Sequence, residues 1–251
     1  MEYLFDVDGT LTPVQQNMPD EFKEFFLDFS GKNKVYLVSG ATYSRLSTQL
    51  GTELLEGVNA VYSNDGSVKT VHGDIIYSHK WEPSVYLMQF LKTLLTNTKW
   101  KGVSGEKFNY LDDRLSYTMV CHNANEEVRE EYYIWDKKET EREIICDLIN
   151  DCYPDVTATI GNKISIDIAP KGIDKSQILD DKDVFCGCTS LRFFTDTPWE
   201  GNSDYYLASR IGEEGKGKTS TVQGWQHTQR LLKELYDGTF VAPFFGNRMT
   251  R

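Results

Sequence analysis

Two aspartates separated by one residue follow directly on the first apolar run of the chain, in the stretch Asp6-Val7-Asp8-Gly9-Thr10. On an extended backbone, side chains two positions apart lie on the same side. Two carboxylates this close repel each other unless a cation joins them, and oxygen ligands suit a hard divalent ion such as Mg²⁺. Asp6 could then attack a phosphorus atom, while Asp8 passes a proton to the leaving oxygen. Gly9 lets the backbone approach a phosphate, to which Thr10 offers a hydroxyl.

Two further positions could hold the same phosphate. Ser39 and Gly40 lie between an apolar run and the start of a helical pattern, an arrangement that turns backbone N–H groups toward an anion. Lys175 follows Asp174, which is a good helix cap. A cation in the first helical turn opposes the helix dipole, so its presence there indicates an anionic partner.

A second motif points to different chemistry. The stretch Gly212–Thr219 matches G-x-x-x-x-G-K-T, the nucleotide-binding loop. That loop requires a buried strand before it and a helix after it, whereas Tyr205–Ile211, with helical spacing, precedes it here. We therefore predict a flexible surface turn at this position and not the site of an ATP-using kinase.

Alternating strand and helix patterns surround the first motif. Apolar runs at 3–7, 34–38, 58–63 and 191–195 predict strands, and helical patterns occur at 21–29, 42–50, 204–211 and 223–236. Such alternation favours an α/β fold with a doubly wound parallel sheet, a Rossmann-like core. We assign residues 1–81 and 170–236 to this core, including a hairpin of strands at 68–71 and 75–78.

The alternation stops between residues 82 and 169, where we predict an inserted α+β cap domain. Its expected elements are a helix at 85–95, a strand at 114–121, a long charged helix at 126–149 and two strands flanking Gly161-Asn162. Residues 237–251 have no periodicity and are predicted to be a C-terminal tail.

Composition excludes several classes of protein. The 251 residues include 27 Lys and Arg against 38 Asp and Glu, a formal charge of −11, which argues against nucleic acid as a partner because its phosphates need a basic face. No apolar run is long enough to span a membrane. Met1 leads at once into the first strand, and five cysteines and four histidines have no framework or zinc-ligand spacing. We therefore expect a cytoplasmic protein with reduced thiols.

The Asp6–Thr12 stretch resembles the first motif of the haloacid dehalogenase superfamily, and the chain from residue 3 to about 236 is similar to its phosphomannomutase-like branch. The supporting stretches are Ser39-Gly40, Asp136–Glu139, Ile164–Asp167, Gly172–Lys175, Asp196–Pro198 and Gly201–Asp204. The resemblance implies an enzyme that transfers a phosphoryl group from a small-molecule sugar phosphate, with Mg²⁺ as cofactor, through a phosphorylated Asp6. Related enzymes pair through their caps, so a homodimer is possible.

The resemblance also assigns roles to individual residues. The catalytic residues would be Asp6, Asp8, Ser39 and Lys175; the metal ligands Asp6, Asp8 and Asp196, supported by Asn202 and Asp204; and the substrate-binding residues Thr10, Gly40, Arg114, Arg129, Ser165 and Asp167. One departure concerns the metal, because Thr195 stands where the family usually has glycine, and a β-branched residue restricts the backbone.

A second departure from the family pattern bears on which of two reactions the protein catalyses. Phosphomannomutases grip the second phosphate of the substrate with several arginines, but Gln15 occupies the place of one, and another falls at His122 or Asn125. Each lost arginine–phosphate contact weakens retention of a bisphosphate about 10-fold or more. We therefore favour hydrolysis by a sugar phosphatase over the alternative, a phosphomannomutase that interconverts mannose 6-phosphate and mannose 1-phosphate. A non-catalytic phosphosugar-binding protein is a further alternative. The identity of the sugar stays open.

Overall fold

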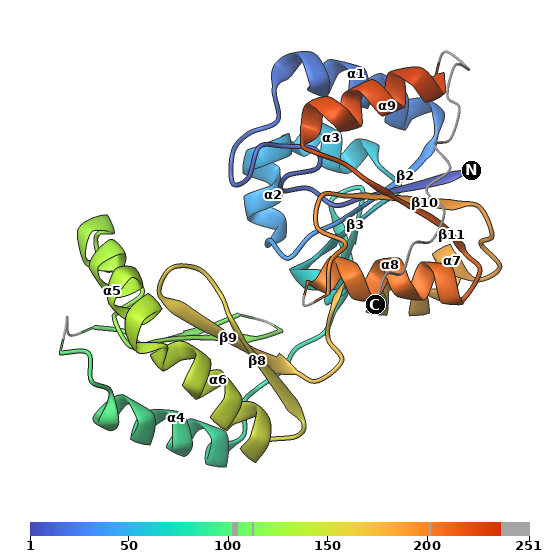
Figure 1. Cartoon of the computed structure of the whole chain (residues 1–251). Helices are drawn as coiled ribbons and strands as arrows, with labels where there is room; N and C mark the ends of the chain where they lie inside the picture. The colour runs from blue at the N-terminus through green and yellow to red at the C-terminus, as the bar shows by residue number, and fades with distance from the viewer. Residues whose placement is uncertain (102–104, 112, 201, 237–251) are drawn as a thin grey trace, which may run out of the picture.

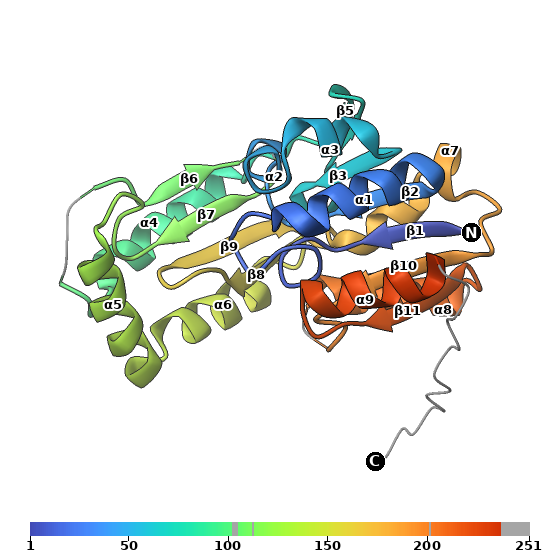
Figure 2. The same cartoon turned by 90° about the horizontal axis from the view of Figure 1, so that it is seen from above.

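The chain folds into two layered bodies joined by two chain crossings (Figure 1). The computed structural model describes residues 1–101, 105–111, 113–200 and 202–236, so the predicted tail at 237–251 lies outside the described residues. The larger body, here called the core, consists of residues 2–78 and 175–236; the smaller one, here called the cap, consists of residues 85–170. The two bodies lie side by side when viewed from above (Figure 2).

The core is built on a seven-stranded sheet with the order β11-β10-β1-β2-β3-β4-β5. Its strands are β1 (Glu2–Phe5), β2 (Lys34–Val38), β3 (Ala60–Ser63), β4 (Val68–Val71), β5 (Asp74–Ser78), β10 (Leu191–Thr195) and β11 (Gly217–Thr221). All pairs from β11 to β3 are parallel, and β4 and β5 form an antiparallel hairpin at the edge. The predicted α/β class with a parallel-sheet core is confirmed.

Helices cover both faces of this sheet (Figure 1). One face packs against α1 (Asp20–Lys32), α2 (Tyr43–Leu50), α3 (Thr52–Gly57) and α9 (Trp225–Tyr236), and the other against η2 (Lys175–Asp180), α7 (Lys182–Phe185) and α8 (Ser203–Glu213). In α1 the spacing of Phe22, Phe26 and Phe29 puts all three rings on one side, where they are buried against the sheet. The short η1 (Asn64–Gly66) follows β3.

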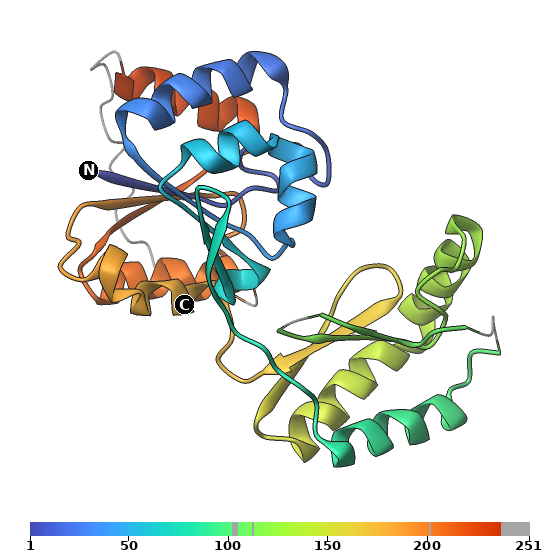
Figure 3. The ribbon, with the colours of Figure 1, turned by 180° about the vertical axis from the view of Figure 1, so that it is seen from behind.

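The cap is a four-stranded antiparallel sheet with helices on one face. It contains α4 (Val85–Asn97), β6 (Phe108–Tyr110), β7 (Leu115–Thr118), α5 (Glu126–Glu139), α6 (Glu141–Cys152), β8 (Val156–Ile160) and β9 (Ser165–Pro170), in the sheet order β6-β7-β9-β8. Tyr117 and Ile166 pack into the apolar layer beneath the helices. Since side chains alternate along a strand, Ser116, Ser165 and Asp167 lie on the opposite face. Seen from behind, the helices lie on the side away from the core (Figure 3).

One element prediction was wrong, and another had the wrong bounds. The single helix predicted over 126–149 is two helices, because Thr140 has a left-handed backbone (φ 53°) that ends α5. The carboxylate of Asp136 accepts hydrogen bonds from the backbone N–H and the guanidinium of Arg142, at 3.0 and 2.7 Å, and so fixes the junction. The turn predicted over Gly212–Thr219 is present but shorter, at residues 214–216, because α8 extends to Glu213 and the edge strand β11 begins at Gly217.

The edge strand β11 explains the misleading nucleotide-loop motif. Gly217 pairs with Leu191, and a Cβ at Gly217 would lie 1.8 Å from the backbone oxygen of Leu191, so glycine is required for pairing. The strand follows the Gly-rich turn, whereas a nucleotide-binding loop needs the strand before it. Among the described helices, none combines the length and apolarity of a bilayer-spanning segment.

Candidate active site

The carboxyl ends of four neighbouring strands bring the candidate residues together. Asp6 follows β1, Ser39 follows β2, Asp65 follows β3 and Asp196 follows β10, at the sheet edge where open α/β folds bind ligands. A cavity of about 320 Å³ lies there. Its lining includes seven residues predicted from the sequence, namely Asp6, Asp8, Ser39, Gly40, Lys175, Asn202 and Asp204.

A tight turn after β1 positions the first aspartate. The carbonyl of Val7 accepts hydrogen bonds from the backbone N–H groups of the three residues 10–12, at 2.8–3.2 Å. Gly9 has φ +80°, and a Cβ on it would lie 2.2 Å from Asp196 Oδ2, so only glycine fits. The Thr10 hydroxyl donates to Asp6 Oδ2 at 3.1 Å. The turn therefore holds Asp6 rigidly and lets Asp196 approach it.

Three carboxylates form a cluster around this point. One oxygen from each of Asp6, Asp196 and Asp204 lies within 4.8 Å of the others. Lys175 Nζ lies 2.6 Å from Asp6 Oδ1 and 2.6 Å from Asp204 Oδ1, and all three side chains are buried. With three carboxylates and one ammonium, the cluster has an excess of negative charge. Such a set of hard oxygen donors fits Mg²⁺ better than a thiolate-preferring metal.

Burial shifts the pKa values of the two acids and of the lysine in opposite directions. Burial raises the pKa of Asp6 to about 7, although Lys175 opposes that shift. Burial also raises the pKa of Asp196. Burial alone would lower the pKa of Lys175, but Asp6 and Asp204 outweigh it and hold that pKa above its ordinary value. The lysine is therefore a permanent cation beside Asp6, which is easily protonated without a metal.

A proton on the Asp6 carboxylate should compete with a metal ion for that carboxylate. Because the pKa of Asp6 is raised to about 7, the carboxyl holds a proton below that pH and loses it above. We expect the affinity for Mg²⁺ to be constant above about pH 7.5 and to fall about tenfold per pH unit below about pH 6.5. Titration calorimetry on the metal-free protein measures this, with Asp6→Asn as the control that should flatten the profile. An affinity independent of pH in the unaltered protein would contradict it.

Thr195, the departure noted in the sequence, holds the cluster together. It is fully buried, and its hydroxyl donates to Asp204 Oδ2 at 2.6 Å. Thr197 donates to the same oxygen at 3.3 Å. Asp204, expected only in a supporting role, thus lies in the cluster itself. The side chain of Asn202 instead donates to the Trp199 carbonyl at 3.4 Å.

Asp8 lies at the cavity but outside the carboxylate cluster. Its Oδ1 accepts hydrogen bonds from the Gln15 backbone N–H at 2.7 Å and from the Gln49 amide at 2.9 Å. Its Oδ2 lies 3.9 Å from Arg45 Nη2, and the side chain is 30% exposed. These contacts hold Asp8 beside the cavity, and its roles in proton transfer and metal binding stay predictions. Ser39 also lines the cavity and is buried, and its hydroxyl accepts a hydrogen bond from Ala41 N at 3.1 Å.

The predicted cap residues lie outside the cavity lining, and their polar groups are engaged within the protein. Arg129 donates to the carbonyls of His122 and Ala124. Asp167 Oδ1 accepts from the Ser116 hydroxyl at 2.8 Å, and the Ser165 hydroxyl accepts from a backbone N–H at 3.2 Å. Ser165 is fully buried and Asp167 is half-buried, so only Asp167 of this pair is accessible on this face of the cap sheet.

Arg114 joins the cap to the core. Its Nη2 lies 2.9 Å from Asp65 Oδ2 in the core and 2.7 Å from Asp113 Oδ2 in the cap. Asp65 also accepts from the Ser203 hydroxyl at 3.2 Å and lines the cavity. We did not predict Asp65 from the sequence, nor Arg45, which lines the same cavity. The signal available for Asp65 was its place after the third parallel strand.

Removing this bridging cation should destabilise the protein. Arg114→Met removes the cation that Asp65 and Asp113 both contact, so we expect the free energy of unfolding to fall by about 2–3 kcal/mol. Urea denaturation measures the change. The double variant Arg114→Met/Asp113→Asn should recover part of the loss, because it removes one of the two carboxylates. A single variant as stable as the parent would contradict the bridge.

Comparison with known proteins agrees with this geometry. The family model described as eukaryotic phosphomannomutase matches residues 22–238. The chain belongs to this family. It is 27% identical over 244 residues to a phosphomannomutase of Saccharomyces cerevisiae, with 93% of each chain covered. It is also 28% identical over 235 residues to phosphomannomutase 1 of Homo sapiens, with 88% of each chain covered.

Solved structures share the fold at low sequence identity. A haloacid dehalogenase-like hydrolase from Bacteroides thetaiotaomicron superposes with a TM-score of 0.59 and 11% identity, over 93% of this chain and 98% of that one. The resemblance predicted from the sequence is confirmed, and with it the expectation of an enzyme of the haloacid-dehalogenase phosphotransferase type.

Proposed function

We propose that this member of the eukaryotic phosphomannomutase family hydrolyses a sugar phosphate through a phosphorylated Asp6. The observation that carries the proposal is that the three cap arginines all have partners within the protein. Arg114 is paired with two carboxylates, Arg129 with backbone carbonyls, and Arg142 with Asp136 and backbone carbonyls. A phosphate entering the cap would have to displace these partners.

The first step forms the aspartyl-phosphate. A carboxylate oxygen of Asp6 attacks phosphorus, and the bond from phosphorus to the sugar oxygen breaks. That oxygen takes a proton from Asp8, which lines the same cavity. Lys175, 2.6 Å from Asp6, offsets the negative charge of the phosphoryl group. We propose that Asp6, Asp196 and Asp204 hold Mg²⁺, which would withdraw charge from the phosphoryl oxygens.

The second step returns the enzyme to its starting state. Asp8, now a carboxylate, takes a proton from a water molecule. The water oxygen attacks phosphorus, the bond to Asp6 breaks, and inorganic phosphate leaves. The 30% exposure of Asp8 gives this water a route to the aspartyl-phosphate.

The charge near the cap also favours hydrolysis over a mutase reaction. A mutase must hold a bisphosphate while it reorients, and each charge-assisted contact is worth about 1.5–3 kcal/mol. Arg114 with Asp65 and Asp113 forms a group of net negative charge, which repels a second phosphate. On the same side, half-buried Asp167 offers a carboxylate that suits sugar hydroxyls.

The second candidate is the mutase itself, because the family and the relatives are named for that reaction. Incubation with mannose 6-phosphate and Mg²⁺ separates the two. Our proposal expects inorganic phosphate with many turnovers, in a screen that includes other sugar phosphates. Formation of mannose 1-phosphate that depends on a bisphosphate activator would identify a mutase. Binding without either product would leave a non-catalytic phosphosugar-binding protein.

Several properties predicted from the sequence accompany this proposal. We propose the boundaries 82–169 for the inserted domain, Mg²⁺ as the cofactor and a cytoplasmic location. A homodimer is a further prediction, which sedimentation of the full chain would test. Gly40 and Asn202, which line the catalytic cavity, and Asp167 keep their predicted roles as proposals, whereas Arg129 and Ser165 would take theirs only after losing the hydrogen bonds that they make within the protein.

A further inference from the structure

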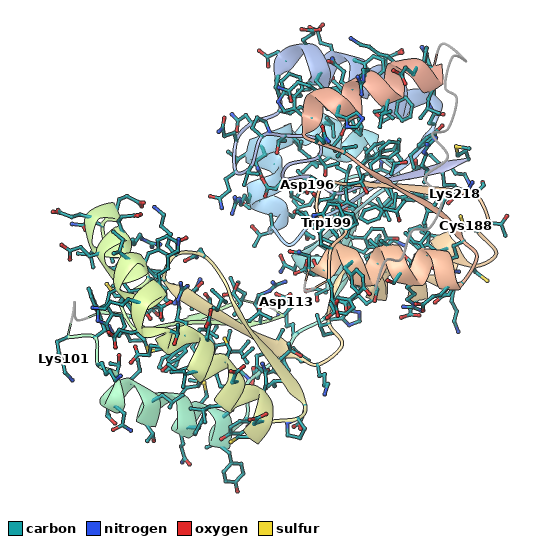
Figure 4. All side chains as sticks on the ribbon, viewed as in Figure 1. Lys101, Asp113, Cys188, Asp196, Trp199 and Lys218 are labelled. Atoms are coloured by element: carbon teal, nitrogen blue, oxygen red, sulfur yellow. The ribbon has the colours of Figure 1, made fainter. Side chains whose placement is uncertain are left out.

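A second and larger cavity lies beside the catalytic one. Its volume is about 620 Å³, and it borders Asp196 on one side and the start of α9 on the other. Val14 lines both cavities, and the loop after β10 separates them, with Thr197 in one lining and Trp199 in the other. Figure 4 labels Asp196 and Trp199 in this part of the core. The cavity therefore adjoins the candidate metal site.

Two tryptophans line this cavity together with the smaller apolar residues Pro13, Val14 and Val222. Trp199 is 59% exposed, and its carbonyl accepts hydrogen bonds from the backbone N–H and the side chain of Asn202 at 3.2 and 3.4 Å. Trp225 is half-buried and stacks on Phe22, with ring centroids 6.0 Å apart. The cavity is thus lined by one exposed indole and by a second indole that packs on the core.

The polar part of the cavity is almost uncharged. Gln223 and Gln226 lie exposed at the start of α9, and Asp196 at the border with the catalytic site is the one charged residue among those lining it. The catalytic cavity, by contrast, is lined by four aspartates, a lysine and an arginine. A phosphate would find no cation among the lining residues of the second cavity, so its ligand should be neutral.

We propose that this second cavity is a subsite for an unphosphorylated sugar ring. The C–H face of a sugar ring packs on the flat face of an indole, and amide groups both donate to and accept from ring hydroxyls. Trp199 and Trp225 supply the indoles, and Gln223 and Gln226 supply the amides. Because Val14 joins the two cavities, a ring bound here could belong to a glycosylated sugar phosphate whose phosphate lies at Asp6.

The start of α9 is fixed relative to the catalytic turn. The Thr228 hydroxyl, which is fully buried, donates to the Thr10 carbonyl at 2.7 Å. The amides at the start of α9 therefore keep their distance from Asp6 without help from the cap. The subsite should exist in the protein before any phosphate binds, and binding of a neutral sugar should not require turnover.

Sugar-observed saturation-transfer NMR on the full chain, titrated with maltose and methyl α-mannoside, tests the proposal. We expect saturable binding of at least one sugar, weakened about tenfold by Trp199→Ala and also weakened by Gln226→Ala. Tyr206→Ala is the matched control, since Tyr206 is an exposed aromatic (48%) on α8 outside the cavity, and it should leave binding unchanged.

Two outcomes would overturn the subsite. One is no saturable binding of either sugar by the unaltered protein; the other is equal binding by Trp199→Ala and its parent. The measurement is independent of the proposed phosphatase reaction. If Asp6→Asn binds the neutral sugar as well as the parent does, the subsite stands even where no sugar phosphate is hydrolysed.

Discussion

Replacing Asp6 with Asn should abolish phosphate release from any sugar phosphate that the protein hydrolyses, with a loss of about 10⁴-fold or more in kcat. An amide oxygen is a poor nucleophile for phosphorus and leaves no aspartyl-phosphate to hydrolyse. The measurement is steady-state release of inorganic phosphate, together with a search for a phosphorylated residue by acid quenching and mass spectrometry in the parent protein.

The same variant should fold as well as the parent. Asp6 is one of three clustered carboxylates, and Lys175 keeps Asp204 at 2.6 Å as a partner. Removing one negative charge from this group relieves repulsion, so we expect an unchanged or higher midpoint of thermal unfolding. Phosphatase activity that survives in a folded Asp6→Asn protein would refute the covalent mechanism and the enzyme hypothesis together.

Replacing Lys175 with Met should have the largest effect on stability. Its ammonium is the ion-pair partner of both Asp6 and Asp204, and all three side chains are at most 7% exposed. Breaking a buried pair by removing one partner costs about 3–5 kcal/mol, because the remaining charges stay buried without compensation. We expect the free energy of unfolding to fall by that amount, as measured by urea denaturation without metal, and phosphate release to be lost.

Adding Mg²⁺ to the variant and to the parent provides the control for this prediction. A divalent cation bound by the same carboxylates should restore part of the stability of Lys175→Met, and it should stabilise this variant more than the parent. The double variant Lys175→Met/Asp204→Asn should also be more stable than Lys175→Met alone. A single variant that unfolds at the same urea concentration as the parent would show that the buried pairs contribute nothing.

Elements with a strong local pattern could be predicted from the sequence. The strands at 34–38 and 191–195 have the predicted bounds, and Thr42 caps α2 by accepting a hydrogen bond from Arg45 N. These features depend on neighbours within a few residues. The first motif belongs to the same class, since one tight turn after one strand positions Asp6.

Features that depend on distant partners could not be predicted in this way. The pairing of Arg114 with Asp65 joins residues of different bodies, and no local pattern indicates it. The break after α5 depends on a left-handed Thr140, a conformation that the residue type does not favour. The effect of having Thr195 in place of the usual glycine could not be predicted, because the hydrogen-bond partner of Thr195, Asp204, lies on the next helix.

The position of β1 in the sheet has a consequence for how the chain is made. β1 lies between β2 and β10, and Glu2 pairs with Leu191. During synthesis, one edge of this apolar strand therefore stays unpaired until the last quarter of the polypeptide, which contains β10, has left the ribosome. The cap is continuous in sequence and can fold in the meantime. Nascent chains stalled before residue 191 should thus contain a protease-resistant cap beside an unfinished, chaperone-binding half-sheet.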